Sequence, residues 1–147
     1  MTRPGLLDVN VLVALFDPEH IHHETAHAWF GGSGRGGWAT CPLTENGLVR
    51  VVSNPRYPGR RTTHDEAMRK LGGFCDHGDH SFWPDSVTIG DSELFKSGSI
   101  HGHKQLTDVY LLALAVANSG LLVTFDRSIP TAAVSGATEN QSILLLA

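Results

Sequence analysis

Four carboxylates stand at the ends of apolar or small-residue segments rather than in charged runs. Asp8 and Asp126 each follow a short apolar run, and Glu45 and Asp108 lie near the beginning of helix-forming segments. An ionised carboxylate beside a core segment raises the free energy of the fold unless a partner satisfies it. Because Mg²⁺ and Mn²⁺ prefer oxygen ligands, this set of acids indicates a site for a hard divalent cation.

The elements that must position these acids alternate between strand-like and helix-like segments. Strands are predicted over residues 4–8, 38–40, 80–83, 121–125 and 142–146. Helices are predicted over residues 9–16, 22–30, 64–74, 91–96 and 108–118, with another beginning at Pro42 and with Thr107 capping the last. Strands separated by helices favour an α/β fold, a three-layer α/β/α arrangement with a mostly parallel central sheet of about five strands. The length of 147 residues indicates a single domain that spans residues 1–147.

In an open α/β sheet, binding sites form beyond the carboxyl ends of the strands. Asp8 and Asp126 come directly after predicted strands, and the helices that carry Glu45 and Asp108 begin near the same edge. Four acids meeting there would repel one another, and one or two cations would relieve that repulsion. A two-metal site activates a water molecule and stabilises the leaving oxygen in phosphodiester cleavage. The spacing alone leaves open whether the four acids meet.

The net charge of −4 argues against a protein that binds nucleic acid through surface charge alone, because such proteins are basic. An acidic site filled by a cation needs no excess of positive charge, since the cation itself meets the phosphate. Six of the eleven Lys and Arg residues fall between positions 50 and 70. They form either an RNA-facing surface or an ordinary solvated face.

Composition also bears on where the protein works. No apolar run approaches the roughly 18 residues of a membrane helix, so we expect no membrane association. The first residues lead directly into a strand-like segment, and we expect no signal peptide. Cys41 and Cys75 have no CxxC spacing. This pattern fits two reduced thiols in a cytoplasmic protein, with a single disulfide as the alternative.

Four short segments carry a resemblance to a known family. Residues 7–12, 44–45, 106–113 and 124–127 resemble the acidic motifs of the PIN domain, in the expected order and in a chain of the expected length. The histidine-rich segment 17–30 is further similar to the VapC-type toxins of bacterial toxin–antitoxin pairs. This resemblance implies a metal-dependent endoribonuclease that uses Mg²⁺ or Mn²⁺ to cleave structured RNA such as tRNA or rRNA. It also implies a homodimer and a cognate VapB-type antitoxin that covers the acidic site.

The resemblance also assigns roles to individual residues. It implies that the catalytic and metal-binding acids are Asp8, Glu45, Asp108 and Asp126. Asn10 and Thr124 match positions where the family has a small polar residue that supports those acids. Residues 55–99 match no motif, so the residues that bind the substrate are not identified, and substrate choice is expected to reside partly there.

The histidines admit several roles. His23 and His27 are spaced i, i+4, which suits two zinc ligands on one helix face, but no further ligand follows at a convincing spacing. A polar or RNA-facing helix surface is the alternative. His101 and His103 precede the Asp108 helix and are either loop residues or general acids, because histidine titrates near neutrality. The same question is open for His20 and His22.

Two other functions compete with the nuclease. A degenerate PIN module would bind RNA or a protein without cutting, although the presence of all four acids disfavours it. A haloacid-dehalogenase-like phosphatase would need Asp-x-Asp after its first strand, where this chain has Asp8-Val9-Asn10. Such an enzyme also needs a lysine before the late acid, and residues 105–125 contain none.

Overall fold

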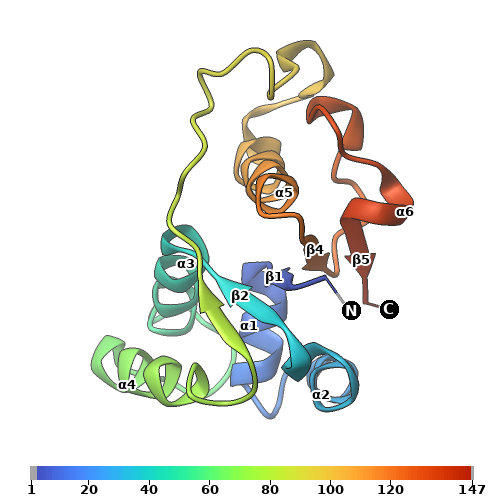
Figure 1. Ribbon diagram of the computed structural model, residues 1–147. Helices are drawn as coiled ribbons and strands as arrows, with labels where there is room; N and C mark the ends of the chain where they lie inside the picture. The colour runs from blue at the N-terminus through green and yellow to red at the C-terminus, as the bar shows by residue number, and fades with distance from the viewer. Residues whose placement is uncertain (1–2, 147) are drawn as a thin grey trace.

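The computed structural model describes residues 3–146, whose five strands form one sheet in the order β3-β2-β1-β4-β5 (Figure 1). All four strand pairs are parallel. The strands are β1 (Gly5–Leu7), β2 (Trp38–Thr40), β3 (His80–Phe82), β4 (Leu121–Thr124) and β5 (Ile143–Leu145). Their carboxyl ends therefore meet at one edge of the sheet, as predicted for a mostly parallel five-stranded sheet.

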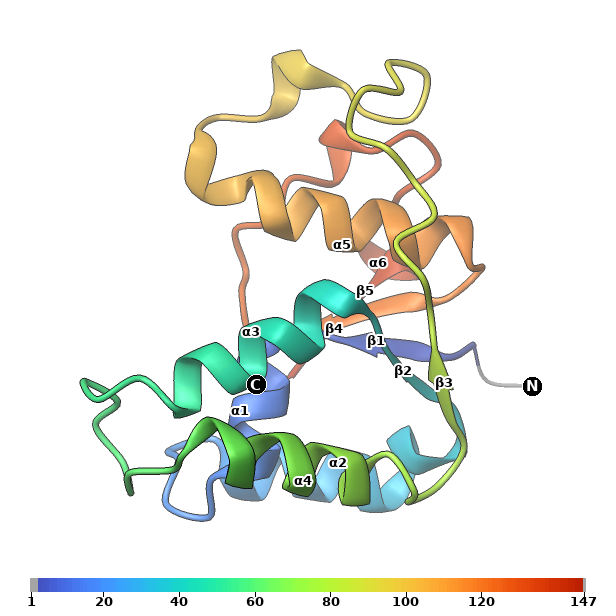
Figure 2. The ribbon, with the colours of Figure 1, turned by 90° about the vertical axis from the view of Figure 1, so that its left-hand side faces the viewer.

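Helices cover both faces of this sheet and complete the predicted three layers. Figure 2 shows α5 on one side of the strands and α1, α2 and α4 on the other. The helices are α1 (Val9–Phe16), α2 (His23–Gly32), α3 (Pro42–Val52), α4 (His64–Phe74), α5 (Leu106–Ala117) and α6 (Glu139–Ser142). None of the described helices combines the length and hydropathy needed to cross a bilayer.

The alternation of side chains along the strands divides the core in two. Leu6 and Leu122 pack on the face that α5 covers, whereas Leu7 and Val123 pack on the face that α1 and α2 cover. Since successive residues of a strand point to opposite faces, Thr124 lies on the α5 face, with Leu122. By the same alternation, Thr40 at the end of β2 points to the other face, together with Trp38.

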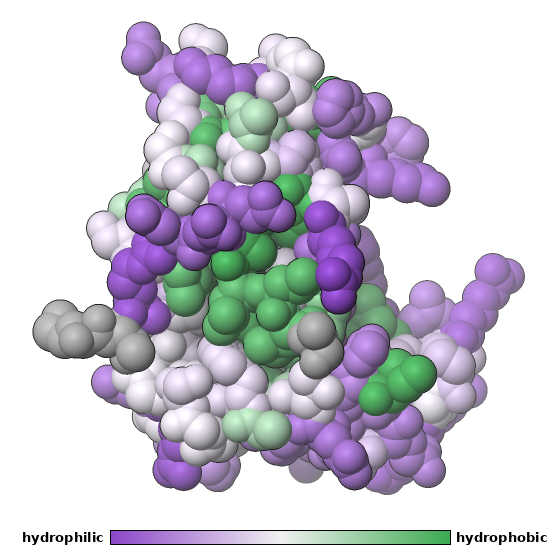
Figure 3. Space-filling view, turned by 90° about the vertical axis from the view of Figure 1, so that its right-hand side faces the viewer, coloured by the Kyte–Doolittle hydropathy of each residue, from purple (hydrophilic) through white to green (hydrophobic). Residues whose placement is uncertain are grey.

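The sheet ends on one side in an apolar edge strand. The residues of β5 are partly exposed, and only β4 pairs with this strand. Figure 3 shows that hydrophobic side chains gather on the side of the molecule where β5 lies. An edge strand of this kind is available for contact with another chain.

One predicted helix start and one predicted helix are wrong. α5 begins at Leu106 rather than at Asp108, and a 3-10 turn over His103–Gln105 leads into it, so Thr107 lies in the first turn and does not cap the helix. Residues 91–96 form a turn instead of a helix. There, Asp91 Oδ1 accepts a hydrogen bond from the amide of Glu93, and Phe95 bridges to Val134. The amide of Phe95 still donates to the carbonyl oxygen of Asp91 at 2.9 Å, but that of Lys96 donates to Ala133 at 2.8 Å, so the turn does not continue as a helix.

Candidate functional site

Asp8 is the most buried acid of the site, with 6% of its side chain exposed. It follows β1 in an extended conformation and caps the N-terminus of α1, where its Oδ1 accepts a hydrogen bond of 2.7 Å from the amide of Val9. Its Oδ2 accepts a second hydrogen bond of 2.8 Å from the hydroxyl of Thr124. Burial raises the pKa of the Asp8 carboxyl, while these two hydrogen bonds lower it. The carboxylate is therefore held in one orientation at the edge of the sheet.

Thr124 joins the first acid to the last. Besides donating to Asp8, its Oγ1 accepts hydrogen bonds from Asn10 Nδ2 at 3.3 Å and from the amide of Asp126 at 3.0 Å. Asn10 Oδ1 also accepts from the amide of Phe125 at 3.4 Å. The two predicted supporting residues thus tie the turn after β4 to the first turn of α1.

Asp108 and Asp126 share a hydrogen bond between their carboxyl groups. Burial and then the charges of Asp8 and Asp126 raise the pKa of Asp108 to about 7. The pKa of Asp126 is lowered, chiefly by hydrogen bonds from the hydroxyl and the amide of Ser128, which lie 2.6 and 2.8 Å from its Oδ1. Asp108 therefore has a much higher pKa than Asp126, although the two carboxyl groups are neighbours.

Three of the four predicted acids thus gather at one end of the sheet, on the face that α5 covers. They come from the end of β1 (Asp8), the first turn of α5 (Asp108) and the turn after β4 (Asp126). Their ligand atoms are only oxygens, and their charges repel one another, as the pKa of Asp108 shows. A hard divalent cation fits such a set, because it binds carboxylate oxygens and cancels their repulsion.

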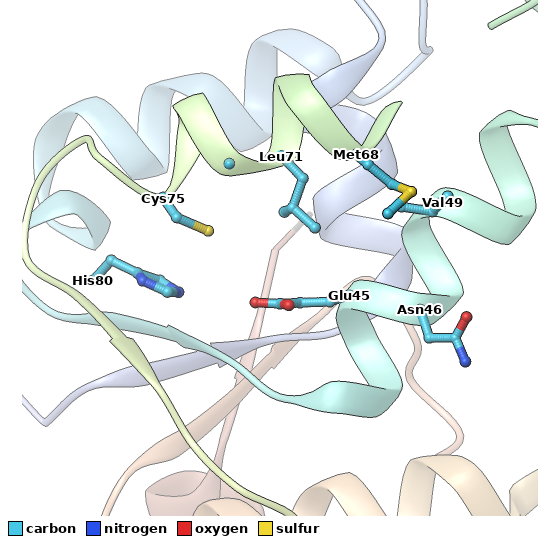
Figure 4. Close-up of a pocket in the computed structure, with 8 residues that line it drawn as sticks. Glu45, Asn46, Val49, Met68, Leu71, Cys75 and His80 are labelled. Atoms are coloured by element: carbon cyan, nitrogen blue, oxygen red, sulfur yellow. The ribbon is translucent and has the colours of Figure 1, made fainter. Parts of the chain in front are cut away.

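Glu45 lies apart from these aspartates in the structure. It occupies the first turn of α3, and its Oε2 accepts a hydrogen bond of 2.6 Å from the hydroxyl of Thr40. The same hydroxyl is 2.8 Å from Nε2 of His80. Figure 4 shows Glu45 directed toward His80 and Cys75, between α3 and α4. The helix start is near the predicted edge, but the side chain turns to the face of the sheet to which Thr40 points.

Cys75 and His80 were not identified as site residues from the sequence. Donor atoms of Glu45, Cys75 and His80 lie within 4.8 Å of one another, the only such group of three in residues 3–146, so the three aspartates are less closely spaced. Burial, and then the charges of Glu45 and Asp76, raise the pKa of the Cys75 thiol to about 11. Burial lowers the pKa of His80. The only sequence signal for this group is a cysteine five positions before a histidine, which by itself is weak.

The histidines of α2 have structural contacts. His23 Nδ1 lies 2.7 Å from the carbonyl oxygen of Ala14, and His27 Nε2 lies 3.1 Å from that of Leu15. Both carbonyls belong to the last turn of α1, where backbone carbonyl oxygens have no amide partner within the helix. This pair therefore attaches α2 to the end of α1, and among residues 3–146 it belongs to no group of three metal-ligating side chains.

Part of the positive charge between residues 50 and 70 is also engaged within the fold. Arg69 forms an ion pair of 3.0 Å with Asp65 on α4, and Lys70 Nζ donates to the carbonyl oxygen of Phe16 at 2.9 Å. Arg50 is exposed. Only some of this cluster is therefore free to meet a phosphate backbone.

Comparison with known proteins gives matches along most of the chain. The model of the PIN domain family matches residues 5–134. The chain is 49% identical over 135 residues to Ribonuclease VapC44 of Mycobacterium tuberculosis, and the aligned region covers 92% of this chain and 94% of the relative. It is 40% identical over 135 residues to Ribonuclease VapC39 of the same organism, covering 92% and 97%. It is 43% identical over 129 residues to Ribonuclease VapC38, also of that organism, covering 88% and 89%.

Proposed function

The chain belongs to the PIN-domain family, with VapC-type ribonucleases among its relatives, and from this premise we propose that it is a metal-dependent endoribonuclease toxin. The observation that carries the proposal is the convergence of Asp8, Asp108 and Asp126 at the carboxyl edge of a parallel sheet. We propose Mg²⁺ or Mn²⁺ as the cofactor, because the converging ligand atoms are all oxygens. The substrate class is structured RNA such as tRNA or rRNA.

The aspartates would hold the cation, with Asn10 and Thr124 as supporting residues. A divalent ion held there would supply an activated water molecule for attack on the phosphodiester and would neutralise charge on the leaving oxygen. Thr124 and the amide of Val9 orient the Asp8 carboxylate, and Ser128 orients that of Asp126. A bound cation would favour the ionised form of Asp108, whose pKa is raised by burial and by the charges of Asp8 and Asp126.

We retain Glu45 as the fourth proposed acid. In the structure its carboxylate accepts the 2.6 Å hydrogen bond from Thr40. To act with the three aspartates, Glu45 would have to break this bond and turn its side chain to the other side of the sheet edge. The aspartates are therefore the first targets for substitution.

The proposal extends to partners and location. We propose a VapB-type antitoxin that covers the acidic site, in line with the names of the relatives, and a single-domain chain that acts in the cytoplasm. We also propose a homodimer, supported by the apolar edge strand β5 on the hydrophobic side seen in Figure 3. Light scattering on the purified chain would measure its mass in solution, and a monomer at micromolar concentration would overturn the dimer.

The test of the nuclease is cleavage of total bacterial RNA by the purified chain with Mg²⁺ or Mn²⁺, with new 5′ ends mapped by sequencing. Asp8→Asn removes a charge with almost no change in shape, and Asp79→Asn is the matched control at an exposed position. We expect discrete cuts that disappear with EDTA and with Asp8→Asn but persist in Asp79→Asn. Folded protein that binds RNA in the presence of metal and never cuts it would identify a binding module instead.

A further inference from the structure

A second group of ligating side chains lies on the α4 side of the sheet. Glu45 in the first turn of α3, Cys75 directly after α4 and His80 at the start of β3 place donor atoms within 4.8 Å of one another (Figure 4). All three side chains are half-buried, and Cys75 is a free thiol. Three separate elements thus bring one oxygen, one sulfur and one nitrogen donor to the same place.

The chemistry of these donors differs from that of the aspartates. Thiolate and imidazole are ligands of the borderline and soft metals, whereas Mg²⁺ and Ca²⁺ take oxygen ligands. Zinc binds cysteine, histidine and carboxylate side chains, and its filled d shell imposes no preferred coordination geometry. Among common cellular cations, zinc therefore suits this mixed set.

The spacing is compatible with a zinc ion after small side-chain rotations. Tetrahedral zinc with bonds of about 2.0 to 2.3 Å separates its ligand atoms by about 3.5 Å. Since no pair in the group is more than 4.8 Å apart, each pair would have to close by about 1.3 Å at most. Such a shift is within the reach of side-chain torsions and leaves the backbone in place.

Thr40 contacts two of the three ligands, Glu45 and His80. Its hydroxyl is fully buried, donates to Glu45 at 2.6 Å and lies 2.8 Å from His80 Nε2. Outer-shell partners of this kind orient the ligands of metal sites.

We propose that Glu45, Cys75 and His80 form a zinc site whose fourth coordination position opens to the cavity between α3 and α4. This cavity has a volume of about 510 Å³, and its walls include Met68 and Leu71. Three protein ligands and one open position are the arrangement of zinc sites that retain a water molecule or an exogenous ligand. The site uses none of the three aspartates. It assigns Glu45 to zinc in the conformation that the structure shows, whereas the nuclease role proposed above requires that side chain to turn away from Thr40.

Cobalt absorption tests this site without any measurement of RNA cleavage. Metal-stripped full-length protein is titrated with Co²⁺ at neutral pH, followed by displacement with Zn²⁺. We expect one equivalent of Co²⁺ to give tetrahedral visible bands and a thiolate charge-transfer band, and one equivalent of Zn²⁺ to abolish them. Excess Mg²⁺ should leave both bands unchanged.

Matched variants assign the ligands. Cys75→Ser should remove the charge-transfer band. His80→Gln should lower the Zn²⁺ affinity at least about 100-fold, because the loss of a residue that only supports a ligand already lowers metal affinity about 10- to 100-fold. Cys41→Ser and His64→Gln, which replace residues of the same types outside the group, should keep the wild-type spectrum. Circular dichroism verifies that each variant is folded.

Two results would overturn the zinc site. One is a wild-type protein with no thiolate band at stoichiometric Co²⁺. The other is a band that survives in folded Cys75→Ser or disappears in Cys41→Ser. Since the readout is spectroscopic, either result leaves the proposed ribonuclease activity to stand or fall by its own test.

Discussion

Replacing Asp108 with asparagine should stabilise the metal-free protein at alkaline pH. Asp108 is half-buried, hydrogen-bonds Asp126 and is repelled by the charges of Asp8 and Asp126, which together with burial raise its pKa to about 7. Asparagine has nearly the same shape as the protonated acid, and its amide can still donate to Asp126. The substitution therefore removes the ionised form while it preserves the hydrogen bond.

The size of the effect follows from the difference between the folded and unfolded pKa values. A pKa of about 7 against the ordinary 3.8 corresponds to about 4 kcal/mol. Because the side chain is half exposed, solvent screening reduces this to about 1 to 2 kcal/mol. Between about pH 4 and pH 7 the native state keeps a proton that the unfolded chain has lost, so the stability of the wild type falls as pH rises. The raised pKa of Asp8 acts in the same direction.

The assay is urea or thermal unfolding of EDTA-treated protein at pH 4 and pH 8, with Asp79→Asn as the control. We expect Asp108→Asn to match the wild type at pH 4 and to melt about 2 to 8 °C higher at pH 8. Saturating Mg²⁺ should reverse this order, because an ion at 100 times its Kd stabilises the wild type by about 2.7 kcal/mol and the variant by less. An equal stability difference at both pH values, or a less stable variant at pH 8, would refute the charge repulsion.

Three further outcomes test other contacts of the site. Thr124→Val removes the hydroxyl that donates to the buried Asp8 carboxylate, so we expect the Mn²⁺ affinity measured by calorimetry to fall about 10- to 100-fold. An unchanged affinity would exclude a supporting role for Thr124. At pH 8 Cys75 of the metal-stripped protein should react with iodoacetamide on the order of 100-fold more slowly than a free cysteine, because its pKa is about 11. Glu45→Gln removes one of the charges that raise this pKa and should accelerate the reaction, which mass spectrometry follows. Reaction at the rate of a free cysteine would contradict this burial and charge. His23→Ala should lower the free energy of unfolding by about 1 kcal/mol without changing Zn²⁺ binding, and a loss of zinc would instead make it a ligand.

The sequence by itself determined the layers and most of the site edge. Short apolar runs separated by amphipathic helices predicted the parallel five-stranded sheet, because the periods of strands and helices are local properties of the chain. The predicted strand over residues 38–40 and helix over 64–74 coincide with β2 and α4. The expected convergence of the four acids rested on the rule that parallel strands end at one edge, on the helix starts near that edge, and on the resemblance to the PIN domain.

Only the tertiary structure decided which way Glu45 points and what it meets. The sequence placed the start of α3 near the acidic edge, yet the side chain follows Thr40 to the opposite face of β2. Cys75 and His80 meet Glu45 because α4 packs against α3 and β3 pairs with β2, although they lie 30 and 35 positions after Glu45 in the chain. No local pattern specifies such a meeting, since it depends on the packing of whole elements. Asp8 and Asp126 could therefore be predicted from strand ends and Asp108 from a helix start, whereas the mixed ligand group required the assembled fold.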